Sequence, residues 1–208
     1  MPSGACPGCG SLLPQNAGST CAGCLALPPR FDEMRAAFVY GGPVRDAILA
    51  LKHSGRMETG VRLGRLAAQF LKLPSDVTDS APLDPLVRRP ASIVVPVPLH
   101  PRRLAERGYN QALLLARGMA SAWGLPVRTG VLHRIRNTGS HQGRTALERR
   151  AALAGAFEVS PGTLAPRVRV VLVDDVTASR STAQECARVL KSAGADAVLV
   201  RVVAASMV

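Results

Sequence analysis

Aromatic residues are scarce in this chain and make up only 3% of its 208 residues. Within the most basic stretch, residues 102–150, the only aromatic residues are Tyr109 and Trp123. The sequence therefore gives little support to a surface on which nucleic-acid bases would stack. Lysine is also rare, with three lysines against 23 arginines in the whole chain. Because this bias is general, the choice of arginine over lysine in any one segment carries little weight.

Long apolar runs are missing as well. No segment reaches the roughly 18 consecutive apolar residues that a membrane-spanning helix requires, and nothing in the sequence resembles a secretory signal. We therefore expect a cytoplasmic protein without membrane insertion, whose cysteines stay reduced. The hydrophobic content of 47% is enough for one substantial core. We expect a small module over residues 1–30 and one α/β domain over residues 31–208.

Four of the five cysteines form two Cys-x-x-Cys pairs that are separated by eleven residues. Two thiolate pairs on turns can close a tetrahedron around Zn²⁺, and a site made only of thiolates leaves no open position for catalysis. The sequence thus predicts a structural zinc site, with disulfides as the alternative. The predicted ligands are Cys6, Cys9, Cys21 and Cys24.

The segment 170–182 carries the clearest functional pattern. An apolar run typical of a buried parallel strand ends in two adjacent carboxylates, and a hydroxyl-rich turn and a helical pattern follow. The first N–H groups of a helix can bind phosphate, and adjacent carboxylates can hold ribose hydroxyls or Mg²⁺. A plain strand, a turn capped by Ser179 or Ser181, and a helix is the alternative. The candidate residues are Asp174, Asp175, Val176, Thr177, Ala178, Ser179, Arg180, Ser181 and Thr182.

Coarser patterns predict the rest of the domain. Strands are expected at 35–40, 92–97 and 195–203, and helices at 44–53 and 61–73. The last strand completes a βαβ unit with segment 170–182. Residues 73–90 contain four prolines and are expected to form a loop. Cys186 is expected in the core.

The 170–182 segment resembles the ribose-phosphate loop of type I phosphoribosyltransferases. Together with the motifs at 40–45, 49–52, 95–100 and 103–111, it makes nearly the whole chain similar to the ComF/GntX family, whose members begin with a four-cysteine zinc module. The resemblance implies an α/β fold, a type I phosphoribosyltransferase-like parallel sheet flanked by helices, with a small N-terminal zinc-ribbon-like module.

For function, the resemblance implies binding of phosphoribosyl pyrophosphate with Mg²⁺ and a role in DNA uptake or natural transformation, with competence proteins as candidate partners. Asp174 and Asp175 would contact the ribose hydroxyls, and the backbone of 176–182 would hold the 5-phosphate. Arg180 stands where the family usually has glycine, and Ala178 replaces a usual hydroxyl residue.

Residues 102–150 contain ten arginines, no lysine and two acids, which is a net charge of 10 − 2 = +8. The shortage of acids favours a functional basic face over a merely solvated one. Its ligand is expected to be a diphosphate or the backbone of a nucleic acid such as single-stranded DNA. By resemblance, residues 98–111 form a pyrophosphate-side loop, and residues 134–145 form an active-site hood. The candidate contact residues are Arg103, Arg107, Asn110, Gln111, Arg134 and Arg136.

Three functions therefore stay open at this point. The first is a ComF-type protein that binds phosphoribosyl pyrophosphate. The second is a nucleic-acid-binding accessory protein that keeps the fold without transferase chemistry. The third is an active phosphoribosyltransferase with an unknown acceptor.

Overall fold

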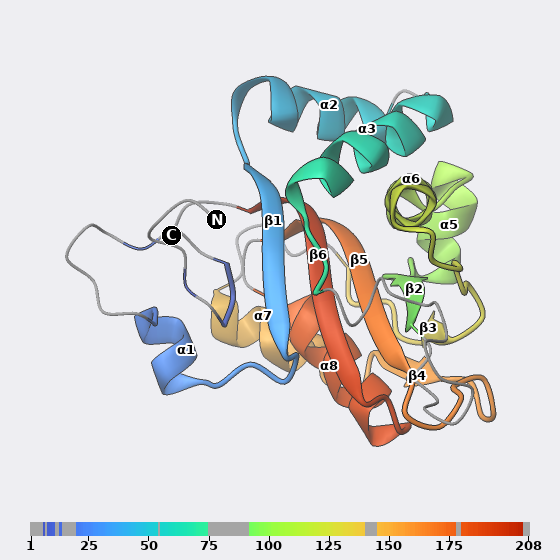
Figure 1. Ribbon diagram of the computed structural model, residues 1–208. Helices are drawn as coiled ribbons and strands as arrows, with labels where there is room; N and C mark the ends of the chain where they lie inside the picture. Colours follow the sequence, from blue (N-terminus) through green and yellow to red (C-terminus); the bar gives the residue numbers. More distant parts are fainter. Residues whose placement is uncertain are drawn as a thin grey trace, which may run out of the picture.

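The computed structural model describes residues 6, 8–10, 13, 20–53, 55–74, 92–139, 145–177 and 180–205. Its centre is a four-stranded parallel sheet in the spatial order β1-β6-β5-β2 (Figure 1). The four strands are β1 (Glu33–Val39), β2 (Ser92–Pro96), β5 (Arg169–Thr177) and β6 (Ala197–Ala205).

Helices surround this sheet, and β3 and β4 pair antiparallel beside it. The described helices are α1 (Ala22–Ala26), α2 (Gly42–His53), α3 (Met57–Phe70), α5 (Pro101–Arg107), α6 (Gln111–Trp123), α7 (Ala146–Leu153) and α8 (Ser181–Ser192). The two short strands are β3 (Leu132–Arg134) and β4 (Phe157–Val159).

The sheet separates two hydrophobic clusters, because successive side chains of a strand point to opposite faces. In β5, Val170 and Leu172 pack with apolar residues of α7 and α8, whereas Val171 and Val173 pack with residues of α2, α3 and α6. Figure 1 shows the same arrangement, with α7 and α8 on one side of the sheet and α2, α3 and α6 on the other. The buried apolar run of β5 is thus explained by helices on both of its faces.

Two glycines allow α3 and α6 to pack with their backbones almost in contact. A Cβ atom at Gly118 would lie 2.1 Å from the carbonyl oxygen of Val61, and one at Gly64 would lie 2.3 Å from that of Leu115. Only glycine fits at such an approach. This packing fixes the position of α6, whose first residue, Gln111, belongs to the candidate site described below.

The predicted parallel α/β fold is confirmed, although element bounds move by a few residues. The strand expected at 35–40 is β1 at Glu33–Val39, and the helix expected at 61–73 is α3 at Met57–Phe70. Most of the loop expected at 73–90 lies outside the described residues. Among the helices that the structure describes, none is long and apolar enough to cross a membrane.

Candidate ligand site and metal centre

The carboxyl ends of β2 and β5 lie side by side, and the chain leaves them toward opposite faces of the sheet. After β2 it leads to α6 in one hydrophobic cluster, and after β5 it leads to α8 in the other. Such a divergence opens a crevice at the edge of a parallel sheet, which is the usual place for a ligand in open α/β folds. Residues 97–111, 174–177 and 180–182 all lie at this edge.

A hollow of about 160 Å³ lies on the α8 side of this edge. Its lining includes Asp174 and Thr177 from the end of β5, Thr182 from the first turn of α8, and Arg149 from α7. Asp174 follows Leu172 by two positions, so its side chain points to the same face as Leu172. The hollow therefore combines an acidic side chain, two hydroxyl groups and a guanidinium at the beginning of α8, where the helix dipole favours an anion.

Asp174 is partly buried at this position, and its carboxyl group does not ionise easily. Burial, followed by the charge of the neighbouring Asp175, raises the pKa of Asp174 to about 8. The backbone N–H of Asp175 donates a hydrogen bond to Asp174 Oδ1 at 2.8 Å. A carboxyl group with this pKa can be protonated at neutral pH, which suits it to hydrogen bonding with an uncharged hydroxyl.

Asp175 points to the opposite face and belongs to a different set of contacts. Its Oδ2 atom accepts a hydrogen bond from Gln111 Nε2 at 3.3 Å and lies 2.9 Å from Lys52 Nζ. Gln111 in turn accepts a hydrogen bond from Arg107 Nη1 at 2.6 Å. The structure therefore brings Asp175, Gln111 and Arg107 together, with Lys52 as a fourth member.

A second hollow of about 460 Å³ lies next to this network. Lys52 and Arg107 contribute to its lining together with His53, Arg103 and Tyr109. Three of these side chains carry a positive charge, and Glu106 is the acid among the lining residues. A cleft with this excess of cations attracts a polyanion such as a diphosphate.

The other predicted contact residues have structural partners. Asn110 caps α6 by accepting a hydrogen bond from the Ala112 N–H at 2.9 Å, and its Nδ2 donates to the Val97 carbonyl at 3.0 Å. Arg134 lies over the ring of Phe157 at 5.5 Å and donates a hydrogen bond to Thr138.

Arg136 donates a hydrogen bond to the carbonyl oxygen of Ala154 at 2.7 Å. Both Arg134 and Arg136 thereby hold the β3–β4 region together, and neither lines the cationic hollow.

Two cationic residues that line the hollows are not among the candidates predicted from the sequence. Lys52 was noted only as part of a family motif, and Arg149 was not assigned to the site. Lys52 lies near the end of α2 and Arg149 within α7, and no local pattern in the sequence links either residue to segment 170–182. Ala178, Ser179 and residues 140–144 of the predicted hood lie outside the described residues.

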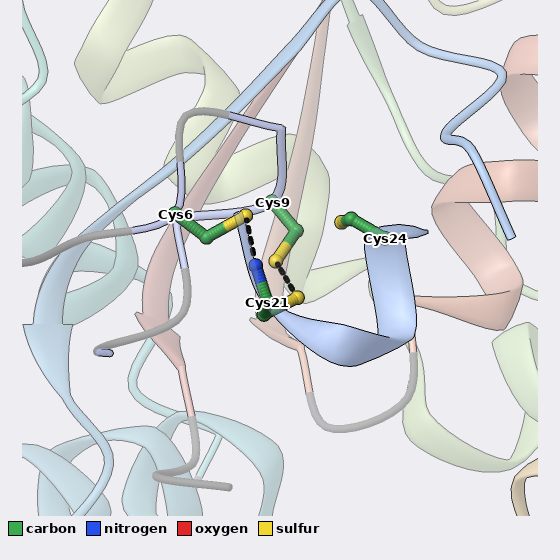
Figure 2. Close-up of side chains that lie close together, drawn as sticks. All are labelled: Cys6, Cys9, Cys21 and Cys24. Atoms are coloured by element: carbon green, nitrogen blue, oxygen red, sulfur yellow. Dashed lines mark hydrogen bonds between the residues drawn. The ribbon is translucent and has the colours of Figure 1, made fainter. Parts of the chain in front are cut away.

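The four cysteines predicted as metal ligands come together in the structure (Figure 2). All four Sγ atoms lie within 4.8 Å of one another, and Cys9 Sγ is 3.6 Å from Cys21 Sγ. The Cys21 N–H donates a hydrogen bond to Cys6 Sγ at 3.4 Å. None of the chain's five cysteines, all of which are described, forms a disulfide.

This geometry fits a tetrahedral metal ion. A zinc–sulfur bond of about 2.3 Å implies sulfur–sulfur distances of about 3.8 Å, close to the separation of Cys9 and Cys21. Burial disfavours ionisation of Cys6, but hydrogen bonds from the N–H groups of Cys21, Cys9 and Gly8 outweigh it and lower the pKa of Cys6 to about 6. Such donors stabilise the thiolate form that binds metal.

One further contact joins this cluster to the candidate phosphate turn, by which we mean Thr177 and residues 180–182 at the start of α8. Arg180, just before α8, lines the hollow that contains Asp174. Its Nη1 atom donates a hydrogen bond to Cys24 Sγ at 2.7 Å.

Comparison with proteins of known name gives the family. Over 196 residues the chain is 32% identical to "Competence protein F" of Haemophilus influenzae, and the match covers 94% of this chain and 82% of that one. The chain belongs to the competence protein F family. It is also 32% identical to "DNA utilization protein YhgH" of Salmonella typhi and 30% identical to the protein of the same name from Escherichia coli K12, each over 94% of this chain and 81% of the relative.

Membership of the competence protein F family confirms the resemblance to ComF/GntX proteins, although no protein-family model matches the chain. Among solved structures, an allosteric regulatory enzyme of purine biosynthesis is similar with 24% identity and a TM-score of 0.43. A glutamine phosphoribosylpyrophosphate amidotransferase from B. subtilis is similar with 23% identity and a TM-score of 0.37. Each match covers 72% of this chain but only about a quarter of the larger enzyme, 25% and 26% respectively.

Proposed function

We propose that this chain binds phosphoribosyl pyrophosphate with Mg²⁺ at the carboxyl edge of β2 and β5. The observation that carries the proposal is the pairing of two hollows across the end of β5. One of them has a carboxylate, hydroxyl groups and a helix start, and the other is lined mainly by cations. A ribose with a phosphate at one end and a diphosphate at the other has matching chemistry at both ends.

In this arrangement each end of the ligand has its own partners. The 5-phosphate binds at the start of α8, near Thr177 and Thr182, and a ribose hydroxyl binds Asp174. The diphosphate occupies the cationic hollow, where Lys52, Arg103 and Arg107 offset its charge. Mg²⁺ would be held by hard oxygen ligands such as Asp175 and would supply positive charge to offset the diphosphate.

Asp175 has to exchange partners during this binding. Its Oδ2 atom is 2.9 Å from Lys52 Nζ in the structure. A diphosphate would compete with Asp175 for Lys52, and Mg²⁺ would compete with Lys52 for Asp175. We therefore expect diphosphate and Mg²⁺ to bind cooperatively, since each releases the partner that the other needs.

The cellular role that we propose is in DNA uptake or DNA utilization. Relatives at 30–32% identity over 94% of the chain are named for competence and for DNA utilization. We propose a cytoplasmic setting, in which a reducing environment keeps the four thiols able to bind Zn²⁺. Zinc in this cluster is structural, because four thiolates leave no position for a substrate.

The proposed ligand is tested by calorimetric titration of the zinc-loaded protein with phosphoribosyl pyrophosphate and Mg²⁺. We expect saturable binding that Asp174→Asn together with Asp175→Asn weakens at least tenfold. Asp196→Asn is the matched control, because Asp196 is a 42% exposed carboxylate just before β6 that pairs with Arg169 at 3.8 Å and lines neither hollow. Equal affinity in the native protein and in the double variant would show that the two acids do not contact the ligand.

A second function, binding to the backbone of single-stranded DNA, is favoured by the exposure of several arginines in residues 102–150. These exposed side chains are Arg102, Arg117, Arg128, Arg136 and Arg150. Affinity for a single strand should then fall with salt by a slope of about −0.7 per neutralised phosphate, and the two acids should matter little. A flat salt response would exclude this function.

A further inference from the structure

Arg180 occupies a backbone conformation that normally favours glycine. Its φ angle is 59°, in the left-handed region, and the described residues include only one other non-glycine residue with positive φ, Arg167. A side chain in this region crowds the backbone, so a compensating interaction is expected. Its hydrogen bond to Cys24 Sγ at 2.7 Å is such an interaction.

The neighbourhood of this contact is shaped to accept a guanidinium. A Cβ atom at Gly23 would lie 2.7 Å from Arg180 Nη2, so a larger residue there would push the guanidinium away from Cys24. A second link holds the same two regions together, because the N–H of Arg30, the last residue of the module, donates to Gln184 Oε1 of α8 at 2.7 Å. The cysteine module is therefore attached to the first turn of α8 at two points.

Charge gives the Arg180 contact a specific role once a metal is bound. Zn²⁺ with four thiolates carries a formal charge of −2, and Cys6, Cys9 and Cys24 are buried. A guanidinium that donates to one of the thiolates offsets part of this charge. Outer-shell partners of this kind typically change metal affinity by about 10- to 100-fold.

The same residue also shapes the candidate phosphate turn. Its carbonyl oxygen accepts the N–H of Gln184 at 2.9 Å, which closes the first turn of α8, and Arg180 lines the hollow beside Asp174. Fixing the guanidinium at Cys24 thus fixes the backbone at which a phosphate would bind. Loss of the metal would remove the charge that holds the guanidinium there.

We propose that Arg180 is a positioning residue that couples the metal centre to the phosphate turn, so that zinc and a 5-phosphate ligand each raise the affinity of the protein for the other. This inference rests on the proposed function, because it requires a phosphate at the start of α8. The coupling is reciprocal by thermodynamic necessity, and it can therefore be measured from the zinc side, without any enzymatic activity.

The test measures zinc transfer from the full chain to a chromophoric chelator, with and without saturating ribose 5-phosphate. Ribose 5-phosphate is chosen because it lacks the diphosphate that would itself bind metal. The variants are Arg180→Gly and Arg180→Lys. Arg167→Gly is the matched control, because Arg167 has the same φ of 59° and does not line the hollow beside Asp174.

We expect Arg180→Gly to lower zinc affinity about tenfold, Arg180→Lys to lower it less, and Arg167→Gly to leave it unchanged. Ribose 5-phosphate should slow zinc transfer from the native protein and from Arg167→Gly, and it should have no effect on Arg180→Gly. With Co²⁺ in place of Zn²⁺, the thiolate-to-metal absorption band should shift in Arg180→Gly alone, because only this variant loses the hydrogen bond to sulfur without replacing it.

The outcomes separate this inference from the proposed function. If calorimetry shows that ribose 5-phosphate binds the native protein but does not change its zinc transfer, the coupling is wrong and the ligand site stands. If ribose 5-phosphate binds neither the native protein nor Arg180→Gly, the proposed function fails and the coupling fails with it. Equal zinc affinity of the native protein and Arg180→Gly would overturn the role of Arg180 whatever the ligand does.

Discussion

The ion pair between Lys52 and Asp175 offers a quantitative test of the network at the end of β5. Lys52 Nζ and Asp175 Oδ2 are 2.9 Å apart, and the side chain of Lys52 is 25% exposed whereas that of Asp175 is 8% exposed. Lys52→Met keeps most of the aliphatic stem and removes the charge, which leaves Asp175 Oδ2 with the 3.3 Å hydrogen bond from Gln111 Nε2. Removing one partner of a fully buried pair costs about 3 to 5 kcal/mol.

Because Lys52 is a quarter exposed, solvent screens part of the interaction, and we expect Lys52→Met to lower the free energy of unfolding by about 2 kcal/mol. For a domain of this size that corresponds to a decrease in Tm of about 4 to 8 °C. The assay is thermal and urea unfolding followed by circular dichroism. Lys72→Met is the control, because Lys72 is exposed.

A double-mutant cycle with Asp175→Asn decides whether the pair itself is responsible. The double variant should be more stable than the sum of the two single effects predicts, by about 1 to 2 kcal/mol. If the two single effects simply add, the ion pair contributes nothing, because Lys52 and Asp175 then stabilise the fold independently.

Three further predictions concern other parts of the molecule. Burial and the Asp175 charge raise the pKa of Asp174 to about 8, so the folded state keeps a proton that the unfolded state loses. Stability should therefore fall as the pH rises from about 4 to about 8, by at most about 1.4 kcal/mol per pH unit, and Asp174→Asn should remove this part of the unfolding profile. Gly118→Ala should destabilise the protein by about 3 kcal/mol or more in urea unfolding, because the new Cβ meets a backbone oxygen, whereas Gly130→Ala, in open space, should have little effect. Metal analysis should find one zinc per chain in the native protein and in Cys186→Ser but a loss of zinc in Cys24→Ser, and retention in Cys24→Ser would contradict the four-cysteine site.

The sequence was most informative where local pattern and tertiary environment agree. The apolar run of β5 is buried on both faces, so its residues are uniformly hydrophobic and easily recognised. The helical pattern after Arg180 corresponds to α8, and the two Cys-x-x-Cys pairs do come together. Each of these features depends on residues that are close in the sequence or on a spacing with a single strong chemical meaning.

Contacts between distant segments were not predictable in the same way. The partnership of Lys52 with Asp175 depends on how α2 packs against the end of β5, which no local pattern encodes. The two acids are neighbours in sequence, and only the strand conformation, which continues to Thr177, shows that their side chains point to opposite faces. Arg134 and Arg136 look like any other arginines of the basic stretch until the partners of β3 are known.

Arg180 illustrates how the structure can change the meaning of a sequence feature. In the sequence it is a residue that departs from the family's usual glycine in a phosphate-binding turn. In the structure its guanidinium contacts a cysteine of a different module, which lies far away in the chain. A charge that would otherwise be assigned to the ligand site is thus already engaged by the predicted metal centre.

Binding of the ligand at the carboxyl edge of β2 and β5 is best tested by amide hydrogen exchange of the zinc-loaded protein with and without phosphoribosyl pyrophosphate and Mg²⁺. We expect slower exchange at Thr177, at Ser181 to Gln184 and at the residues that line the cationic hollow, while the ends of β1 and β6 farthest from the site stay unchanged. Saturating ligand that leaves the amides at the start of α8 unprotected, or that protects only residues away from the carboxyl edge of β2 and β5, would contradict it.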